Sequence, residues 1–110
     1  MAISSVSPSG FSISVVPGLE EVTVVPAGDL DVASAGLVEH EVNELRRLGV
    51  GHVVIDLRQV DFIDSRGLQL LLVLRNAAKR DRQTLTLVPG PDRVQRLFAL
   101  TATAGLFDWA

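Results

Sequence analysis

The segment Asp61–Leu68 places a hydroxyl among acidic side chains, between an apolar run and an apolar helical pattern. Ser65 directly follows Asp64, and Asp61 lies earlier in the same segment. A serine at a helix N-terminus caps the helix by accepting a hydrogen bond from a free amide of the first turn. The same position suits a phosphoryl group, because free amides and the helix dipole favour an anion. Residue type alone favours the cap, and both roles stay open for Ser65.

Gly67 falls inside the predicted first turn of that helix, where alanine would be the better helix former by roughly 1 kcal/mol. This choice of residue indicates that another part of the chain approaches the backbone closely there. A second acidic segment, Gly28–Asp31, follows the second predicted strand. If it neighbours Ser65, a phosphate would add about two negative charges beside Asp64. A partner that docks on an acidic or neutral patch would then be repelled.

The strands that position these residues follow from the apolar pattern. Alternation predicts an opening hairpin of two strands, Phe11–Val16 and Glu21–Ala27. A continuous apolar run over 53–57 is typical of a strand buried on both faces, and such strands are usually central and often parallel. Thr84–Val88 alternates again, and Gly105–Ala110 is expected to be a short edge strand or a docked terminus.

Apolar residues at spacings of three or four predict three helices, over 31–48, from the Ser65 junction to Ala78, and over 92–100. The predicted fold class is therefore α/β: a sandwich of a mixed four- to five-stranded sheet packed against three or more helices. Residues 1–10, rich in serine and without charge, are predicted to be a flexible N-terminal arm. Residues 11–110 are predicted to form a single domain.

Composition excludes several functions. The chain has 110 residues, 47% of them hydrophobic and 21% charged, which is typical of a globular domain. Only 5% are aromatic, so we expect an aliphatic core. A formal net charge of -3 argues against a nucleic-acid partner, because phosphate recognition needs a cationic face.

The chain has no cysteine, which excludes disulfides, thiolate metal sites and thiol catalysis, and its two histidines cannot build a metal site alone. We therefore expect no metal. No stretch approaches the roughly 20 apolar residues of a membrane span, and no basic start precedes an apolar core. The expectation is a cytoplasmic protein without membrane insertion.

Asp56, near the end of a buried strand, resembles the acceptor of receiver domains. Such a site needs an acidic pair for Mg²⁺ and a late-strand lysine, whereas the only lysine, Lys79, lies on a predicted helix. We expect Asp56 to be a strand-end residue with a local hydrogen bond. His40 is interpreted as solvated, and His52 as the residue that opens the central strand, a turn residue and not a ligand. The prediction is a protein that is not an enzyme and has no catalytic residues.

Three segments resemble the motifs of STAS domains, the sulfate-transporter and anti-sigma-factor-antagonist family. Gly28–Asp31 resembles the family's glycine-acid-leucine-aspartate motif, and Asp64–Leu68 resembles its Asp-Ser-Ser/Thr-Gly-Leu phosphorylation loop. Arg93–Phe98, followed by Gly105 and Leu106, resembles its last helix and tail. The order and spacing of the three support the assignment over about Phe11 to Trp109.

This resemblance implies a bacterial regulator of transcription. Stand-alone members are mostly anti-sigma factor antagonists, controlled by a partner-switching kinase that phosphorylates the serine corresponding to Ser65. The unphosphorylated form would bind the anti-sigma factor kinase and release a sigma factor, and a phosphoserine phosphatase would reset Ser65. ATP and Mg²⁺ would belong to the kinase, and this chain would need no cofactor.

The implied partner-binding residues lie in the two motif loops and on the helix that begins there: Gly28, Asp29, Leu30, Asp31, Asp64, Ser65, Arg66, Gly67 and Gln69. Arg66 departs from the family's Ser or Thr, which removes a second acceptor and adds a cation. The alternative is a STAS module of a transport or sensory complex that contacts a protein or binds a small molecule. In that case Ser65 is only a cap and is not phosphorylated.

Overall fold

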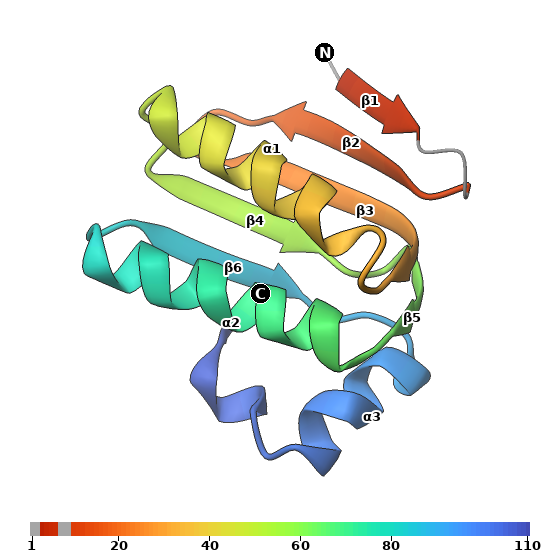
Figure 1. Cartoon of the computed structure of the whole chain (residues 1–110). Coiled ribbons are helices and arrows are strands. Elements are labelled where there is room, and N and C mark those ends of the chain that lie inside the picture. Colours follow the sequence, from red (N-terminus) through yellow and green to blue (C-terminus); the bar gives the residue numbers. More distant parts are fainter. Residues whose placement is uncertain (1–2, 7–9) are drawn as a thin grey trace.

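The computed structural model describes residues 3–6 and 10–110, and its helices and strands follow the two periods of the apolar pattern (Figure 1). The strands are β1 (Ile3–Val6), β2 (Ser12–Pro17), β3 (Val22–Leu30), β4 (His52–Asp56), β5 (Val60–Ile63), β6 (Thr84–Val88) and β7 (Asp108–Trp109). The helices are α1 (Ala35–Arg47), α2 (Ser65–Arg80), α3 (Asp92–Leu100) and the short 3-10 helix η1 (Ala104–Leu106).

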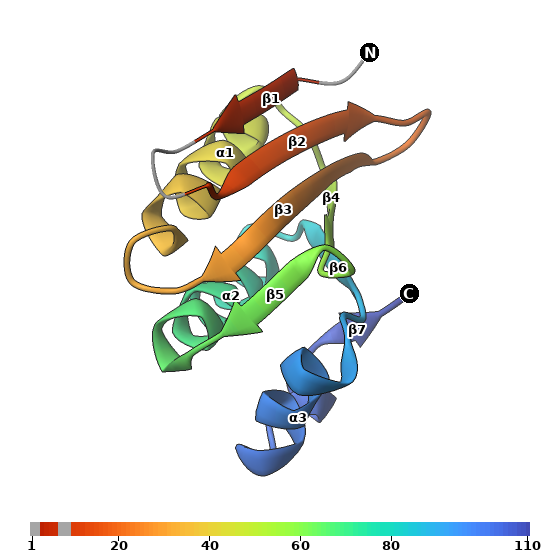
Figure 2. The ribbon, with the colours of Figure 1, turned by 90° about the vertical axis from the view of Figure 1, so that its right-hand side faces the viewer.

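The strands form one mixed sheet in the order β1-β2-β3-β4-β6-β7, with β5 paired to β3 (Figure 2). β3 runs antiparallel to β2 and has two successive parallel partners on its other edge. Val22–Val24 pair with β4, and Gly28–Leu30 pair with β5. Pro26 lies between these two stretches, at a position where its missing amide hydrogen is tolerated. The change of partner carries β3 to the edge of the sheet where the motif loops begin.

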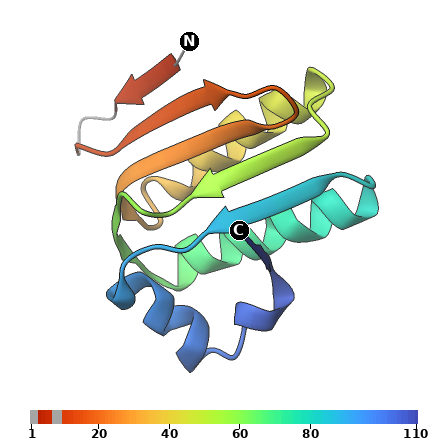
Figure 3. The ribbon, with the colours of Figure 1, turned by 180° about the vertical axis from the view of Figure 1, so that it is seen from behind.

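α1 and α2 lie side by side on one face of the sheet, and in the described part of the chain no helix covers the opposite face (Figures 1 and 3). Side chains that point between the sheet and these helices form the core. Fully buried examples are Val24, Ile55 and Leu87 on strands and Val42 and Leu71 on helices. The core is mainly aliphatic, as the composition predicted.

The C-terminal segment packs at the β6 edge of the sheet and against β5. α3 contacts β5, and β7 pairs in parallel with β6. The buried ring of Phe98 makes edge contacts with Phe107 and Trp109, at ring-centroid distances of 5.5 and 5.0 Å. Within residues 3–6 and 10–110, every helix is too short or too polar to cross a membrane.

The fold class and the main elements are confirmed: the hairpin, the central parallel strand, the strand Thr84–Val88, the three helices and the short last strand are all present. The described sheet has seven strands, more than the four to five that the sequence predicted. The arm predicted over residues 1–10 needs correction for residues 3–6, because these form β1 and pair antiparallel with β2. The remainder of that prediction falls mostly outside the described residues. β5 was also not predicted, because four residues with Asp61 and Phe62 exposed carry little periodic signal.

Candidate functional site

The two acidic segments lie side by side because β3 and β5 are parallel neighbours that end at the same edge. Leu30 pairs with Ile63, the last residues of the two strands. The amide of Asp64 then donates to the carbonyl of Leu30 at 3.3 Å. The turn that follows β3 therefore neighbours the N-terminus of α2, so the condition that the sequence left open for Gly28–Asp31 and the Ser65 junction is met.

Asp64, and not Ser65, caps α2. Its backbone is extended, and its Oδ1 accepts from the amides of Arg66 at 2.9 Å and Gly67 at 3.0 Å. Ser65 is the first residue of the helix itself. The N-cap role that residue type favoured for Ser65 is therefore wrong by one position, and the Ser65 hydroxyl does not cap the N-terminus of α2.

The Ser65 side chain is exposed at the start of α2. Its hydroxyl makes no hydrogen bond with any other residue that the structure describes. Asp64 already accepts from the amides of Arg66 and Gly67, so these two first-turn amides are not free to bind a phosphate on Ser65. A phosphate on Ser65 would therefore project from the surface and act through its charge.

Gly67 is buried where α2 crosses the end of β3. A Cβ built on Gly67 would collide with the carbonyl oxygen of Leu30 and would lie 2.9 Å from Cγ1 of Ile63. The close backbone approach predicted from this glycine is confirmed. It sets the distance between the Ser65 helix and the Gly28–Asp31 segment.

Asp31 holds the turn between β3 and α1. Its Oδ1 accepts from the amides of Ala33 at 2.9 Å and Ser34 at 3.3 Å. The buried Ser34 hydroxyl donates to the carbonyl of Asp29 at 2.6 Å and accepts from the amide of Asp31 at 3.0 Å. Asp31 thus has a structural role in addition to the surface role expected from the motif, whereas the side chain of Asp29 is exposed.

Two hollows flank the Ser65 turn. One, of about 280 Å³, is lined by Gly28, Asp29, Asp31 and Asp61 and carries negative charge. The other, of about 200 Å³, lies between α1 and α2 and contains Arg66 and Gln69 in its lining. The predicted partner-binding residues therefore occupy one end of the molecule, with Leu30 and Gly67 buried beneath the exposed ones.

Two apolar side chains beside this site were missed by the sequence analysis. Val32, in the turn after β3, is 71% exposed, and Phe62, on β5, is 52% exposed. The sequence could have indicated this exposure, because each residue is a large apolar side chain directly beside a motif loop. Val32 and Phe62 also fit the apolar pattern of a buried strand or helix end, however, so the sequence does not distinguish the two cases. The exposure of these two side chains adds apolar contact area to the ends of β3 and β5, next to the two motif loops.

Asp56 lies at the end of β4 and is bound locally, as predicted. Arg58 donates from Nε and Nη2 to both carboxylate oxygens, at 3.0 Å to Oδ1 and 2.8 Å to Oδ2. These hydrogen bonds lower the pKa of Asp56, and burial opposes the shift in part. His52 opens β4, as predicted, and a ring nitrogen lies 3.0 Å from the Thr86 hydroxyl, so its side chain belongs to the strand and not to the preceding turn.

Fold and site together define a small α/β domain that presents a free serine between acidic loops. The chain belongs to the STAS domain family: the family model described as "Mlab, STAS domain" matches residues 15–108. The resemblance noted in the motifs is thereby confirmed across most of the chain.

Several proteins similar to this chain are anti-sigma factor antagonists. The anti-sigma-B factor antagonist of Staphylococcus aureus is 29% identical over 79 residues, which span 72% of this chain and 73% of that protein. The crystal structure of an anti-sigma factor antagonist from Mycobacterium paratuberculosis superposes with a TM-score of 0.82 at 21% identity, covering 96% of this chain and 89% of that chain.

The anti-sigma factor antagonist SpoIIAA has the same fold. Its unphosphorylated form superposes with a TM-score of 0.74 at 16% identity, over 89% of this chain and 87% of that chain. The phosphorylated form of the Bacillus protein gives 0.68 at 15% identity, over 89% and 90%. At these identities the superpositions show a shared fold.

Proposed function

We propose that this protein is an anti-sigma factor antagonist switched by phosphorylation of Ser65. The unphosphorylated chain binds an anti-sigma factor that is also a serine kinase, and this binding releases a sigma factor. The kinase supplies ATP and Mg²⁺, transfers a phosphoryl group to the Ser65 hydroxyl and thereby ends the binding. A phosphoserine phosphatase restores the unphosphorylated form, and the whole cycle takes place in the cytoplasm.

The observation that carries this proposal is the exposed hydroxyl of Ser65 at the start of α2, next to the turn that Asp31 holds. Among the described residues this hydroxyl makes no hydrogen bond, so its modification would break no contact within the fold. Phosphate adds about two negative charges to a surface that already has Asp29 and Asp64. Repulsion of a partner that has docked on this surface is the expected effect. Arg66, exposed beside the acceptor, is a candidate contact for carboxylates of the kinase.

The proposal is tested by isolating the protein from its own cells, mapping phosphorylation by intact mass and peptide fragmentation, and identifying the bound proteins. We expect phosphate on Ser65 and an ATP-binding kinase as partner. In titration calorimetry with that kinase, Ser65→Ala should bind as the unmodified chain does, and Ser65→Glu should bind at least about tenfold more weakly. Equal affinities of the two variants would contradict the switch.

The same isolation separates the proposal from the alternative within the family. A Ser65 that stays unmodified under every growth condition, together with a bound transporter or sensory component, would assign the chain to a constitutive interaction module. Ser65 would then have no regulatory role, and neither variant would change the affinity for that component.

A further inference from the structure

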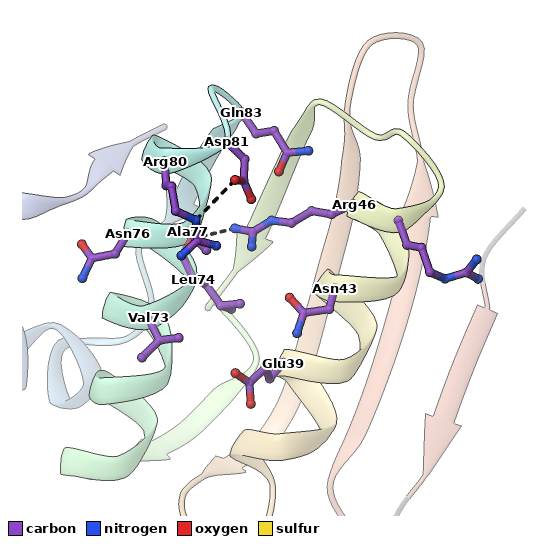
Figure 4. A pocket seen from close by; sticks show the side chains of 11 residues that line it. Glu39, Asn43, Arg46, Val73, Leu74, Asn76, Ala77, Arg80, Asp81 and Gln83 are labelled. Carbon is purple, nitrogen blue, oxygen red and sulfur yellow. Dashed lines mark hydrogen bonds and ion pairs between the residues drawn. The ribbon is translucent and has the colours of Figure 1, made fainter.

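A groove runs between α1 and α2 from the Ser65 end of the molecule to the opposite end, and Figure 4 shows the part of it that contains Arg46 and Gln83. It consists of two adjoining hollows, of about 200 and 640 Å³, which share Glu39 and Val73 in their linings. We call this the interhelical groove. Its apolar end contains Val32, Ala35, Gly36, Leu70 and Val73, and its polar end contains three arginines, Arg46, Arg47 and Arg80, with Asn43, Asp81 and Gln83. Glu39 lies between the two ends, so the cations outnumber the carboxylates at the polar end.

Arg46 supplies an unneutralised charge at the polar end. Its side chain reaches across the groove and Nη2 donates to the carbonyl of Leu74 at 2.6 Å (Figure 4). In the described ranges no carboxylate lies within ion-pair distance of Arg46, whereas Arg80 has Asp81 at 3.3 Å. Partial burial lowers the pKa of Arg46, Asp81 raises it in part and Arg80 lowers it further. A half-buried guanidinium in this state favours the arrival of an anion.

Gln83 supplies a second unmet group in the same hollow. Its Oε1 is buried and has no hydrogen-bond partner among the described residues. A buried amide oxygen without a donor costs free energy, so a rotation of the Gln83 side chain that brings Oε1 to an N–H or O–H group of a ligand in the groove is favoured. A peptide with an acidic side chain carries both required groups, since its carboxylate suits Arg46 and its backbone amide suits Gln83.

The opposite end of the groove suits an apolar side chain. Val32 and Val73 are 71% and 46% exposed, and the small residues Ala35 and Gly36 leave space between them. Arg66, which directly follows Ser65, lines this end as well. The groove is thus continuous with the surface on which the anti-sigma factor is proposed to dock.

We propose that the interhelical groove binds an acidic segment of the anti-sigma factor, with an apolar side chain at the Val32 end and a carboxylate at Arg46. This inference rests on the proposed function and adds a second contact to it. Gly36 and Arg46 are ten positions apart on α1, a rise of about 15 Å along the helix. The two anchoring side chains of the partner are therefore about ten residues apart in a helix or about five apart in a strand.

The test measures the affinity of the purified anti-sigma factor kinase for the full chain by titration calorimetry. Asn43→Glu places a negative charge in the polar end, and Ala99→Glu adds the same charge at an exposed position of α3 outside the groove. Arg46→Gln removes the unpaired cation, and Arg96→Gln is its control on α3. We expect both groove variants to weaken binding about tenfold and both controls to bind normally.

The outcomes separate this inference from the proposed function. If Ser65→Glu abolishes binding while Asn43→Glu and Arg46→Gln bind normally, the groove contact is wrong and the switch stands. If the groove variants weaken binding and Ser65→Glu does not, the groove contact stands and the switch is wrong. Normal binding by all of them, or the absence of any anti-sigma factor partner, overturns both.

A free small anion is the competing occupant, and citrate serves as its probe. In a nuclear magnetic resonance titration, citrate at millimolar concentration should leave the Arg46 and Gln83 signals largely unperturbed if the groove needs a longer segment. Saturable perturbation of both signals by citrate, combined with normal binding of the kinase to Asn43→Glu, would assign the groove to a small anion and overturn the proposal.

Discussion

The Cα of Gly67 faces the carbonyl oxygen of Leu30 so closely that a Cβ cannot be accommodated between α2 and β3. Gly67→Ala should therefore destabilise the protein by about 1–3 kcal/mol, although alanine is the better helix former. Gly36, on the exposed side of α1, has nothing within 4 Å of a built Cβ. Gly36→Ala should stabilise by roughly 0.5–1 kcal/mol. Urea denaturation measures both, and two stabilising substitutions would contradict this contact.

The capping of α2 distinguishes Asp64 from Ser65. Because Asp64 accepts from two first-turn amides, Asp64→Ala should lower the free energy of unfolding by about 0.5–2 kcal/mol. Ser65→Ala should change it by less than about 0.5 kcal/mol, since this side chain is exposed. Thermal and urea denaturation of the two variants provide the measurement. A larger loss of unfolding free energy from Ser65→Ala than from Asp64→Ala would show that Ser65, and not Asp64, caps α2.

Substitution of Asp31 separates its turn-forming role from its charge. Asp31→Asn keeps an Oδ1 acceptor for the amides of Ala33 and Ser34, so its stability should stay within about 0.5 kcal/mol of the original. Asp31→Ala loses both bonds and should cost about 1 kcal/mol. Denaturation curves give the stabilities, and the rate of Ser65 phosphorylation by the co-purified kinase gives recognition. We expect Asp31→Asn to change the rate of Ser65 phosphorylation while the free energy of unfolding stays nearly the same. An unfolded Asp31→Asn protein would contradict this.

The Asp56–Arg58 pair makes stability depend on pH. Hydrogen bonds from Arg58 hold the folded pKa of Asp56 below its ordinary value of 3.8. Such a group stabilises the fold above that value, and its contribution is lost as the pH falls through the lower folded pKa. Arg58→Gln should therefore be less stable than the original chain near neutral pH, and the difference should shrink below about pH 4.

The measurement for this pair is the free energy of unfolding in urea at several pH values between about 3 and 7. Arg96→Gln, an exposed arginine on α3, controls for the change in net charge. A difference between Arg58→Gln and the original chain that stays constant over the whole range would show that the ion pair is not linked to folding.

The elements of this protein were predictable because hydrophobic period is a local property. Alternation defined Thr84–Val88 and spacing of three and four defined 92–100, and both match β6 and α3. β1 and β5 were not predictable in the same way. Each is a four-residue strand whose identity depends on a partner strand elsewhere in the chain, β2 for one and β3 for the other.

The candidate site was predictable from its motifs only in part. The types and order of Gly28–Asp31 and Asp64–Leu68 indicated an acceptor serine between acidic residues. Which residue caps α2 depended on where the backbone turns from extended to helical, and the end of β5 sets that point at Asp64. Spacing along the chain has an uncertainty of a residue or two at such a boundary.

By itself, the sequence determined the α/β class, the aliphatic core and the family, because these depend on residue types and on periods within each segment. Only the tertiary structure decided that the amide of Asp64 meets the carbonyl of Leu30 and that the Ser65 hydroxyl stays free. It also decided that Arg46 and Gln83 line one groove. These relationships join residues distant in sequence, and the pairing of strands and the packing of α1 against α2 create them.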